Sequence, residues 1–287
     1  ASRGLGDVYK RQVDYVRPQI DTHKSRWFFF SSASRPFGMV SLSPDTWTEG
    51  SWNSGYLYNS KEIRCFSHVH CWQLAGVPVM PTTGEVKGHK GMDAYKSTYS
   101  HETEIVKPGY HKVELDTYQI RVELTSTSRV GMHRYTYPAG EKANVLFDVG
   151  ALLAHGKTEK AAIHRISSKE IGGYSVLAPT SRRKKPVTVY FVARFNQNMT
   201  AFGGWEKEGK EKKLVHKNSI EGADIGGYAS FGKLKKQTLL MKVGISYVSE
   251  EQARINLEKE LAHWNFDRVK EDAFAEWNRE LGKITVE

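Results

Sequence analysis

Lys112-Val113-Glu114-Leu115 and, shortly after it, Ile120-Arg121-Val122-Glu123-Leu124 alternate charged and apolar side chains. Alternation with a period of two places one face of a strand in a core and the other in water, as in antiparallel sheets. Further segments repeat the pattern, and turns rich in Gly and Pro separate them, at 145–149, 187–193 and 239–245. The region 109–248 therefore predicts a mainly β fold, an antiparallel β-sandwich and not a set of βαβ units.

The C-terminal end changes to helical patterning. Ser249 and Gln252 form a capping-box pattern that predicts a helix through about Leu261. A second helix is expected from about Asp267, with Gly282 as its C-cap. Its apolar residues recur at every fourth position, and this stripe would pack on the sandwich or on a following domain. The stripe consists of Val269, Ala273, Trp277 and Leu281.

The first twelve residues need separate treatment. Asp7-Val8-Tyr9-Lys10-Arg11-Gln12 is what the transposase mosaic end used to build sequencing libraries would encode. We therefore interpret residues 1–12 as a sequencing-adapter artefact, outside fold reasoning. This predicts three parts: the artefact, a β-sandwich over 13–248, and linker helices over 249–287 that lead toward a further domain. A signal peptide is absent from the sequence, and a lost leader would explain that.

Composition excludes several classes of protein. With 39% hydrophobic and 26% charged residues the 287-residue chain should fold, and no apolar run is long enough to span a membrane as a helix. The net charge of +10 is concentrated in two runs between strand-like segments, at 182–186 and 207–217. Solvated hairpin loops account for such runs, and no nucleic-acid-binding signature accompanies them. We expect no nucleic-acid partner.

The segment Cys65-Phe66-Ser67-His68-Val69-His70-Cys71 contains both cysteines of the chain. Cys and His are zinc ligands, but in an extended segment the two histidines and the two cysteines point to opposite faces. A structural zinc site, a strained Cys65–Cys71 disulfide and a cysteine nucleophile remain alternatives to two buried thiols. We expect buried thiols, with His68 and His70 on one polar face.

Aromatic residues cluster beside these histidines, which is typical of a sugar-binding surface. Aromatic faces cover the apolar side of a sugar ring, while His and Asp side chains bond its hydroxyls. The alternative is that the aromatics only fill the core of the sandwich and its edges. Acidic residues are scattered and show no spacing that would fix the carboxylate pair of a glycoside hydrolase.

Several blocks of the chain together resemble the N-terminal domain of glycoside hydrolase family 92, the calcium-dependent exo-acting α-mannosidases. Their shared order carries the resemblance more than any one of them. The blocks are Val13-Asp14, Pro36-Phe37-Gly38-Met39-Val40, Leu42-Ser43-Pro44-Asp45, Gly55-Tyr56, Phe66-Ser67-His68-Val69-His70, Met80-Pro81-Thr82, Tyr99-Ser100-His101-Glu102, Lys107-Pro108-Gly109-Tyr110, 129–135, 242–248 and Ala275-Glu276-Trp277-Asn278.

The resemblance implies a β-sandwich of the galactose mutarotase-like type that packs on an (α/α) barrel. It implies cleavage of terminal α-mannose from mannans or N-glycans with inversion, by a Glu acid and an Asp base in the barrel, beyond this chain. Ca²⁺ would be bound mainly by that missing domain. The enzyme would be secreted, periplasmic or on the cell surface, and the fragment alone would be inactive. The alternative is a free-standing carbohydrate-binding sandwich without catalysis.

The resemblance also places substrate-binding residues on this chain, although the catalytic pair and the metal ligands lie elsewhere. We expect the sandwich loops to close one side of the sugar pocket by stacking and hydroxyl recognition. The predicted substrate-binding residues are Phe37, Gly38, Asp45, Tyr56, His68, His70 and, as an outer platform, Trp72. The continuation Cys71-Trp72-Gln73-Leu74 departs from the family pattern, which leaves linkage specificity open.

Overall fold

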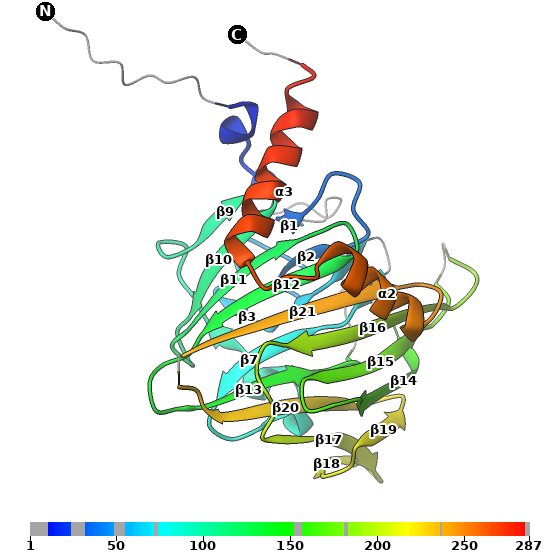
Figure 1. Cartoon of the computed structure of the whole chain (residues 1–287). Coiled ribbons are helices and arrows are strands. Elements are labelled where there is room, and N and C mark those ends of the chain that lie inside the picture. The colour runs from blue at the N-terminus through cyan, green and yellow to red at the C-terminus, as the bar shows by residue number, and fades with distance from the viewer. Residues whose placement is uncertain are drawn as a thin grey trace, which may run out of the picture.

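Two large antiparallel sheets face each other and form a sandwich in the computed structural model (Figure 1). The structure describes residues 11–23, 32–48, 55–71, 74–151, 157–180, 183–235 and 237–284. Trp72 lies outside these residues, and the side chain of Cys71 is not described either. The predicted fold class, a mainly β sandwich followed by helices, is confirmed.

The first sheet has eight strands and mixes early and late parts of the chain. In spatial order they are β1 (Ala33–Ser34), β2 (Ser41–Asp45), β4 (Cys65–Ser67), β7 (Val79–Thr83), β13 (Lys142–Phe147), β20 (Gly226–Lys233), β17 (Ala201–Glu208) and β18 (Glu211–Val215).

The second sheet has nine strands. In spatial order they are β19 (Ser219–Gly222), β14 (Thr158–Arg165), β15 (Glu170–Leu177), β16 (Val187–Phe195), β21 (Thr238–Ser246), β12 (Val130–Thr136), β11 (Ile120–Ser126), β10 (Tyr110–Leu115) and β9 (Ile105–Lys107).

Short elements join and cover these sheets. They are the pair β3 (Glu62–Ile63) and β8 (Ser97–Thr98), the hairpin β5 (Val69–Cys71) and β6 (Leu74–Gly76), and the single turns η1 (Gln12–Tyr15), η2 (Gly88–Lys90) and α1 (Met92–Tyr95).

The core lies between the two sheets, as the alternating pattern predicts. Val113 and Leu115 of β10 and Val122 of β11 are fully buried, while Lys112 and Glu114 are partly exposed and Arg121 exposed. The β10–β11 register pairs Val113 with Val122 across the hairpin, so their side chains share one face. Burial of this apolar face supplies the main driving force for the sandwich.

The two C-terminal helices cover the outer face of the nine-stranded sheet. α2 (Glu250–Glu260) begins at Ser249, whose side chain accepts a hydrogen bond from Gln252 N as predicted. Its Ala253 and Leu257 pack with Val130 and Val192 in a second apolar cluster. Gly244 on β21 permits this close approach, since a Cβ there would lie 2.4 Å from Ala253 O.

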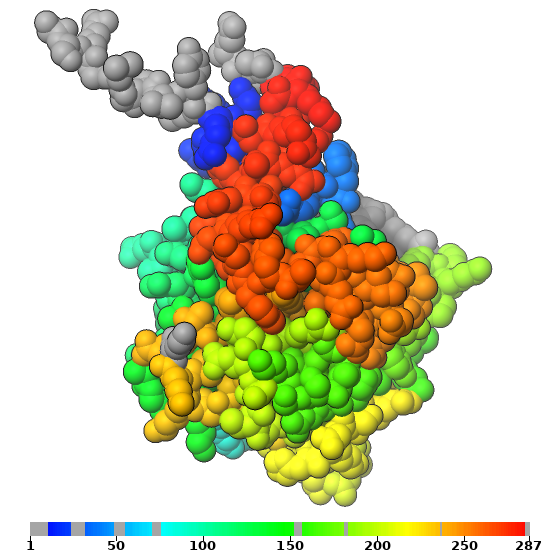
Figure 2. All heavy atoms as spheres, in the orientation of Figure 1, coloured from blue at the N-terminus to red at the C-terminus, as the bar shows by residue number. Residues whose placement is uncertain are grey.

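α3 (Phe266–Leu281) packs its predicted stripe on the sandwich only in part. Val269 and Ala273 are buried, whereas Trp277 and Leu281 are partly exposed. Gly282 ends the helix as expected, although with right-handed and not left-handed backbone angles. The outer end of α3 rises above the sandwich with η1 beside it (Figure 2).

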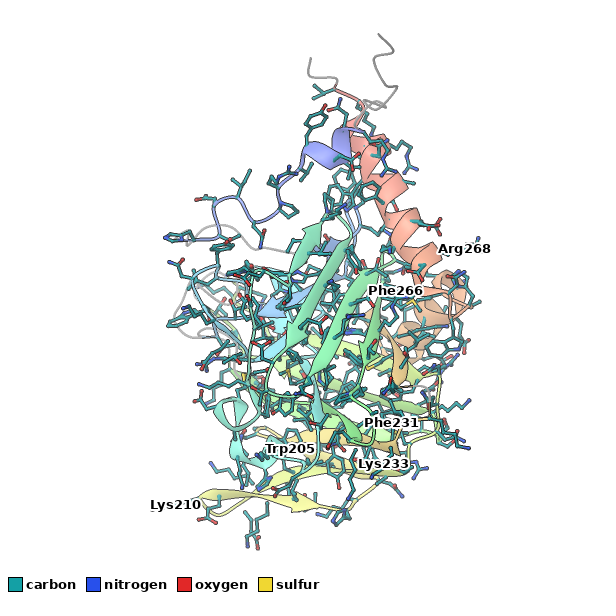
Figure 3. The ribbon with its side chains drawn as sticks, turned by 90° about the vertical axis from the view of Figure 1, so that its left-hand side faces the viewer. Trp205, Lys210, Phe231, Lys233, Phe266 and Arg268 are labelled. Carbon is teal, nitrogen blue, oxygen red and sulfur yellow. The ribbon has the colours of Figure 1, made fainter. Side chains whose placement is uncertain are left out.

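The second basic run forms a hairpin, as predicted. It comprises the end of β17, a turn with Lys210 at its tip and the whole of β18, and the tip lies at the far end of the molecule from α3 (Figure 3). Its charges are partly balanced within the hairpin region, because Lys213 pairs with Glu208 and Lys217 with Glu206.

Candidate functional site

The turn between β1 and β2 presents an aromatic side chain to solvent. Gly38 N donates to Arg35 O at 3.1 Å, which closes the turn. Phe37 at its tip is 99% exposed and has a φ of +59°. A non-glycine residue in this left-handed region costs about 1–3 kcal/mol, and such strain persists only where the surroundings impose it. The turn therefore holds a large apolar side chain outward at an energetic cost.

Arg35 fixes this turn to helix α3. Its Nη1 lies 2.5 Å from Glu276 Oε2, and its Nε donates to Ser126 O at 2.7 Å. Only 10% of its side chain is exposed, so solvent screens the ion pair weakly. Trp277 of the same helix donates from Nε1 to Ser34 O at 2.7 Å. The turn that carries Phe37 is thus held from both the sheet and the helix.

At the C-terminal end of β2, Asp45 is the centre of a buried polar cluster. Its Oδ2 accepts from Ser67 Oγ at 2.5 Å and from Cys65 Sγ at 3.2 Å, and its Oδ1 lies 2.8 Å from His70 Nε2. His70 Nδ1 lies 2.6 Å from Ser41 O. Burial disfavours the imidazolium, but the Asp45 carboxylate outweighs this and raises the pKa of His70. Both ring nitrogens of His70 thus face oxygen acceptors.

The Cys65 thiol belongs to this cluster and is fully buried. Burial, and next the Asp45 carboxylate, raise the pKa of the thiol well above its ordinary value. A thiol in this environment is a poor nucleophile, which argues against the cysteine-nucleophile alternative. The described residues contain no group of three or more His, Cys, Asp or Glu side chains arranged to hold a metal ion.

His68 and His133 form a second buried pair, between the two sheets. Their Nε2 atoms lie 2.8 Å apart. The outer nitrogens also have partners: His68 Nδ1 lies 2.7 Å from Val77 O, and His133 Nδ1 lies 2.8 Å from Tyr135 Oη. Burial lowers the pKa of His68 to about 4 and that of His133 well below its usual value. Both rings are therefore neutral near pH 7.

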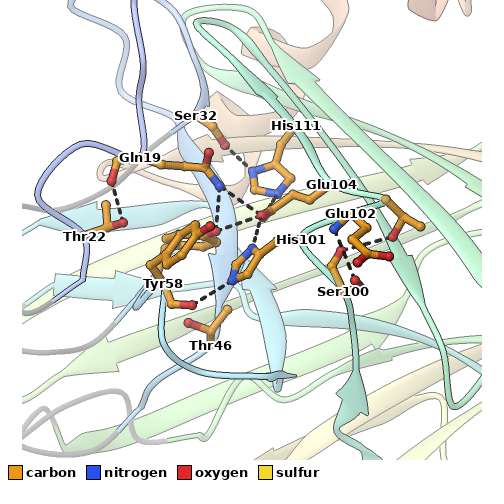
Figure 4. A network of polar contacts seen from close by, with 12 residues as sticks. Gln19, Thr22, Ser32, Thr46, Tyr58, Ser100, His101, Glu102, Glu104 and His111 are labelled. Carbon is orange, nitrogen blue, oxygen red and sulfur yellow. Dashed lines mark hydrogen bonds and ion pairs between the residues drawn. The ribbon is translucent and has the colours of Figure 1, made fainter.

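A third network surrounds Glu104 (Figure 4). Its side chain is 1% exposed and accepts four hydrogen bonds. The donors are His101 Nδ1 at 2.6 Å, His111 Nε2 at 2.9 Å, Tyr56 Oη at 2.9 Å and Gln19 Nε2 at 3.0 Å. Burial alone would raise the pKa of Glu104, but the bonds from His111 and His101 outweigh it and lower the pKa.

Tyr58 completes this region toward the surface. Its ring stacks on the His101 imidazole with centroids 4.0 Å apart and planes 5° apart, and it is partly exposed. His101 Nε2 lies 2.8 Å from Tyr58 O. The network thus fixes an exposed aromatic face on a rigid polar base.

The comparisons with known proteins place this geometry in a family. The model of the glycosyl hydrolase family 92 N-terminal domain matches residues 15–246, and that of the family 92 catalytic domain matches residues 252–287. The chain belongs to glycoside hydrolase family 92. Of the catalytic domain, this family 92 chain contains only a short stretch, which includes most of α2 and all of α3.

Solved structures agree with the family assignment. A family 92 α-mannosidase from Bacteroides thetaiotaomicron is 29% identical, with a TM-score of 0.84 over 98% of this chain and 39% of its own. A family 92 inverting mannosidase from the same species is 22% identical and shares the fold, with a TM-score of 0.80 over 96% of this chain and 37% of its own. The family 92 chain thus spans less than two fifths of these proteins.

A secreted relative is also similar. An uncharacterized secreted glycosidase of Arthroderma benhamiae is 24% identical over 90% of the family 92 chain, which covers 36% of that relative. None of the described helices is long and apolar enough to cross a membrane.

The predicted substrate-binding residues occupy different surroundings in the family 92 chain. Phe37 and the partly exposed Gly38 lie on the outward turn. Tyr56 belongs to the Glu104 network and Asp45 and His70 to the Asp45 cluster, while His68 pairs with His133. Trp72 lies outside the described residues. Contact with a sugar stays a prediction for all seven.

Sequence reasoning missed Glu104, His111 and His133 as members of these networks. His111 is in phase with the buried Val113 on β10, and His133 with the buried Tyr135 on β12. A polar residue in the apolar phase of a strand predicts a buried side chain that needs a partner. Glu104 lies between β8 and β9, where no periodicity marks it.

Proposed function

We propose that this chain is the N-terminal, sugar-facing part of an inverting exo-α-mannosidase that removes terminal α-mannose from mannans or N-glycans. Family membership supports the reaction class, and the Phe37 turn supports the role of the sandwich. An aromatic that is almost fully exposed, strained and clamped to α3 is suited to cover the apolar face of a sugar at the border with a following (α/α) barrel domain.

In this proposal the sandwich binds and orients, and the barrel domain supplies the Glu acid and the Asp base. Phe37 stacks on the substrate, Gly38 allows the ring to approach the turn, and Trp72 forms an outer platform. Asp45, His68, His70 and Tyr56 line the pocket or hold its wall, since most of their polar atoms already have partners within the chain. We therefore expect this chain alone to be inactive.

The family implies Ca²⁺, and we assign its binding to the barrel domain. Two candidate carboxylates are engaged within the chain: Glu276 pairs with Arg35 of the Phe37 turn, and Asp45, at the end of β2, accepts from Ser67 and His70. They do not fit a Ca²⁺ site, which takes six to eight oxygen ligands. The secreted relative supports an extracytoplasmic location.

The test uses the protein in which this chain is continued by its family 92 catalytic domain. Hydrolysis of an α-mannoside, followed by proton NMR, should release β-mannose first, as inversion requires. Phe37→Ala should lower kcat/KM by about tenfold or more, the loss of a stacked ring. Tyr15→Ala, which removes an aromatic that is 60% exposed on η1, serves as the control.

Absence of hydrolysis with intact, saturable mannoside binding would favour the non-catalytic carbohydrate-binding module. Equal activity of the Phe37→Ala variant and the parent would remove the Phe37 turn from the pocket.

A further inference from the structure

A cavity lies beyond the end of β2 that is opposite to the Phe37 turn. Phe37 precedes β2, whereas Thr48, which follows it, lines the cavity. Its volume is about 700 Å³, within the range of small-molecule sites. Among the described residues, six charged ones line it: Arg64, Asp148, Lys157, Lys207, Lys212 and Asp224.

Asp148 is the buried charge in this wall and is incompletely bonded. The residue follows β13 and is 4% exposed, and its backbone N–H donates to Pro78 O at 3.1 Å. Its Oδ2 accepts from Tyr95 Oη at 2.7 Å, but its buried Oδ1 has no hydrogen-bond partner. An unpaired buried carboxylate oxygen is energetically unfavourable, so this oxygen calls for a donor from a ligand.

The charges of the wall decide which ligand fits. Four basic residues oppose a metal cation, although Lys212 is itself paired with Asp224 at 2.5 Å. Asp148 and Asp224 oppose an anion. A neutral polyhydroxylated ring meets both demands, because hydroxyls donate to a carboxylate and accept from ammonium groups. Met92 and Ala151 add apolar lining for the C–H face of such a ring.

We propose that this cavity binds a neutral sugar ring, with Asp148 Oδ1 accepting its hydroxyl protons and the lysine side chains donating to its oxygens. The site is separate from the Phe37 turn and requires no catalysis. It therefore goes beyond the proposed hydrolysis, and its success or failure is independent of that activity.

Asp148→Asn tests the acceptor directly. The amide oxygen can keep the bond from Tyr95, and the NH₂ group then replaces Oδ1, so that an acceptor becomes a donor. Calorimetric titration of the full chain with methyl α-mannoside, α-glucoside and α-galactoside should show saturable millimolar or tighter binding of at least one. The Asn variant should bind that glycoside about tenfold or more weakly, the loss of one charge-assisted hydrogen bond.

Asp116→Asn is the matched control, because Asp116 is exposed and does not line the cavity; its affinity should equal that of the parent. A second variant, Lys157→Ala with Lys207→Ala, alters only exposed lining residues and should weaken binding several-fold even if the Asn variant misfolds.

No saturable binding of any of the three glycosides overturns the proposal, as does equal affinity of the parent and a folded Asn variant. If the Asn variant does not fold, unchanged affinity of the double lysine variant overturns it. Unchanged mannosidase activity of the Phe37→Ala protein, with this binding retained, would count only against the role of the Phe37 turn in hydrolysis.

Discussion

The Nε2 atoms of His68 and His133 face each other at 2.8 Å inside the closed sandwich, so only one of them carries a proton. The carbonyl of Val77 requires the His68 proton on Nδ1. His68 Nε2 then accepts from His133 Nε2, and His133 Nδ1 accepts from the Tyr135 hydroxyl. The carbonyl of Val77 therefore fixes which ring nitrogen carries the proton in both histidines.

This order predicts opposite tautomers for two neighbouring histidines. Nitrogen-15 NMR should show His68 protonated at Nδ1 and His133 at Nε2 at pH 7, with His68 titrating near its pKa of about 4. Because both pKa values are lowered in the folded state, acidification below about 6.5 favours the unfolded chain. A titration of His68 or His133 near pH 6.5 would contradict the pairing.

Glu104→Gln should destabilise the chain by about 2–4 kcal/mol at pH 7, because one acceptor of a buried, four-bonded carboxylate becomes a donor. The lowered pKa of Glu104 means that its contribution is present above about pH 4.5 and is lost as pH falls through the folded pKa. Urea unfolding at pH 7 and pH 4 measures both effects.

Glu102→Gln is the control for this change, since that residue is exposed and two positions away. We expect it to alter the unfolding free energy by less than about 0.5 kcal/mol. A similarly small effect of Glu104→Gln would show that the network does not stabilise the fold.

Arg35→Ala should destabilise the chain by about 2–4 kcal/mol, since it leaves Glu276 and the carbonyl of Ser126 without a partner near a largely buried surface. Lys213→Ala removes an exposed pair with Glu208 and should cost less than about 1 kcal/mol. Thermal and urea unfolding of the two variants measure the difference. Equal costs would mean that the Phe37 turn is held without the ion pair.

The pH dependence expected for Asp148→Asn is opposite in sign to that for Glu104→Gln. Burial raises the pKa of Asp148 from 3.8 to about 6, so the parent chain loses stability as pH rises through that range. Relative to the parent, the Asn variant should gain on the order of 3 kcal/mol between pH 4 and pH 7. Unfolding free energies across this interval test it, and a constant difference would contradict the shift.

Gly244→Ala should destabilise the chain by about 1–3 kcal/mol, because the new Cβ would meet the backbone oxygen of Ala253 in α2. Gly38→Ala places a Cβ at 3.4 Å from its nearest neighbours, an ordinary contact, and should be nearly neutral. Comparison of the two by urea unfolding separates crowding under the helix from a general cost of replacing glycine.

The fold was accessible from sequence because strand alternation is a local signal. Val113 and Val122 follow it, and they pair across the hairpin. The cap at Ser249 is local too. The networks were not accessible in the same way: Gln19, Tyr56 and Glu104 come from three loops far apart in the chain. Only His111 and His133, polar residues in apolar phase, gave a local hint of burial.

The boundary between the two family matches does not coincide with the boundary of the apolar core. The match to the N-terminal domain ends at residue 246. The outer apolar face of the nine-stranded sheet is nevertheless covered by α2, most of which matches the catalytic domain. A protein truncated between β21 and α2 would expose Val130, Met132 and Val192 together, and such an exposed hydrophobic patch promotes aggregation. Inheritance of this sandwich as an exchangeable module would therefore require it to carry its neighbour's first helix.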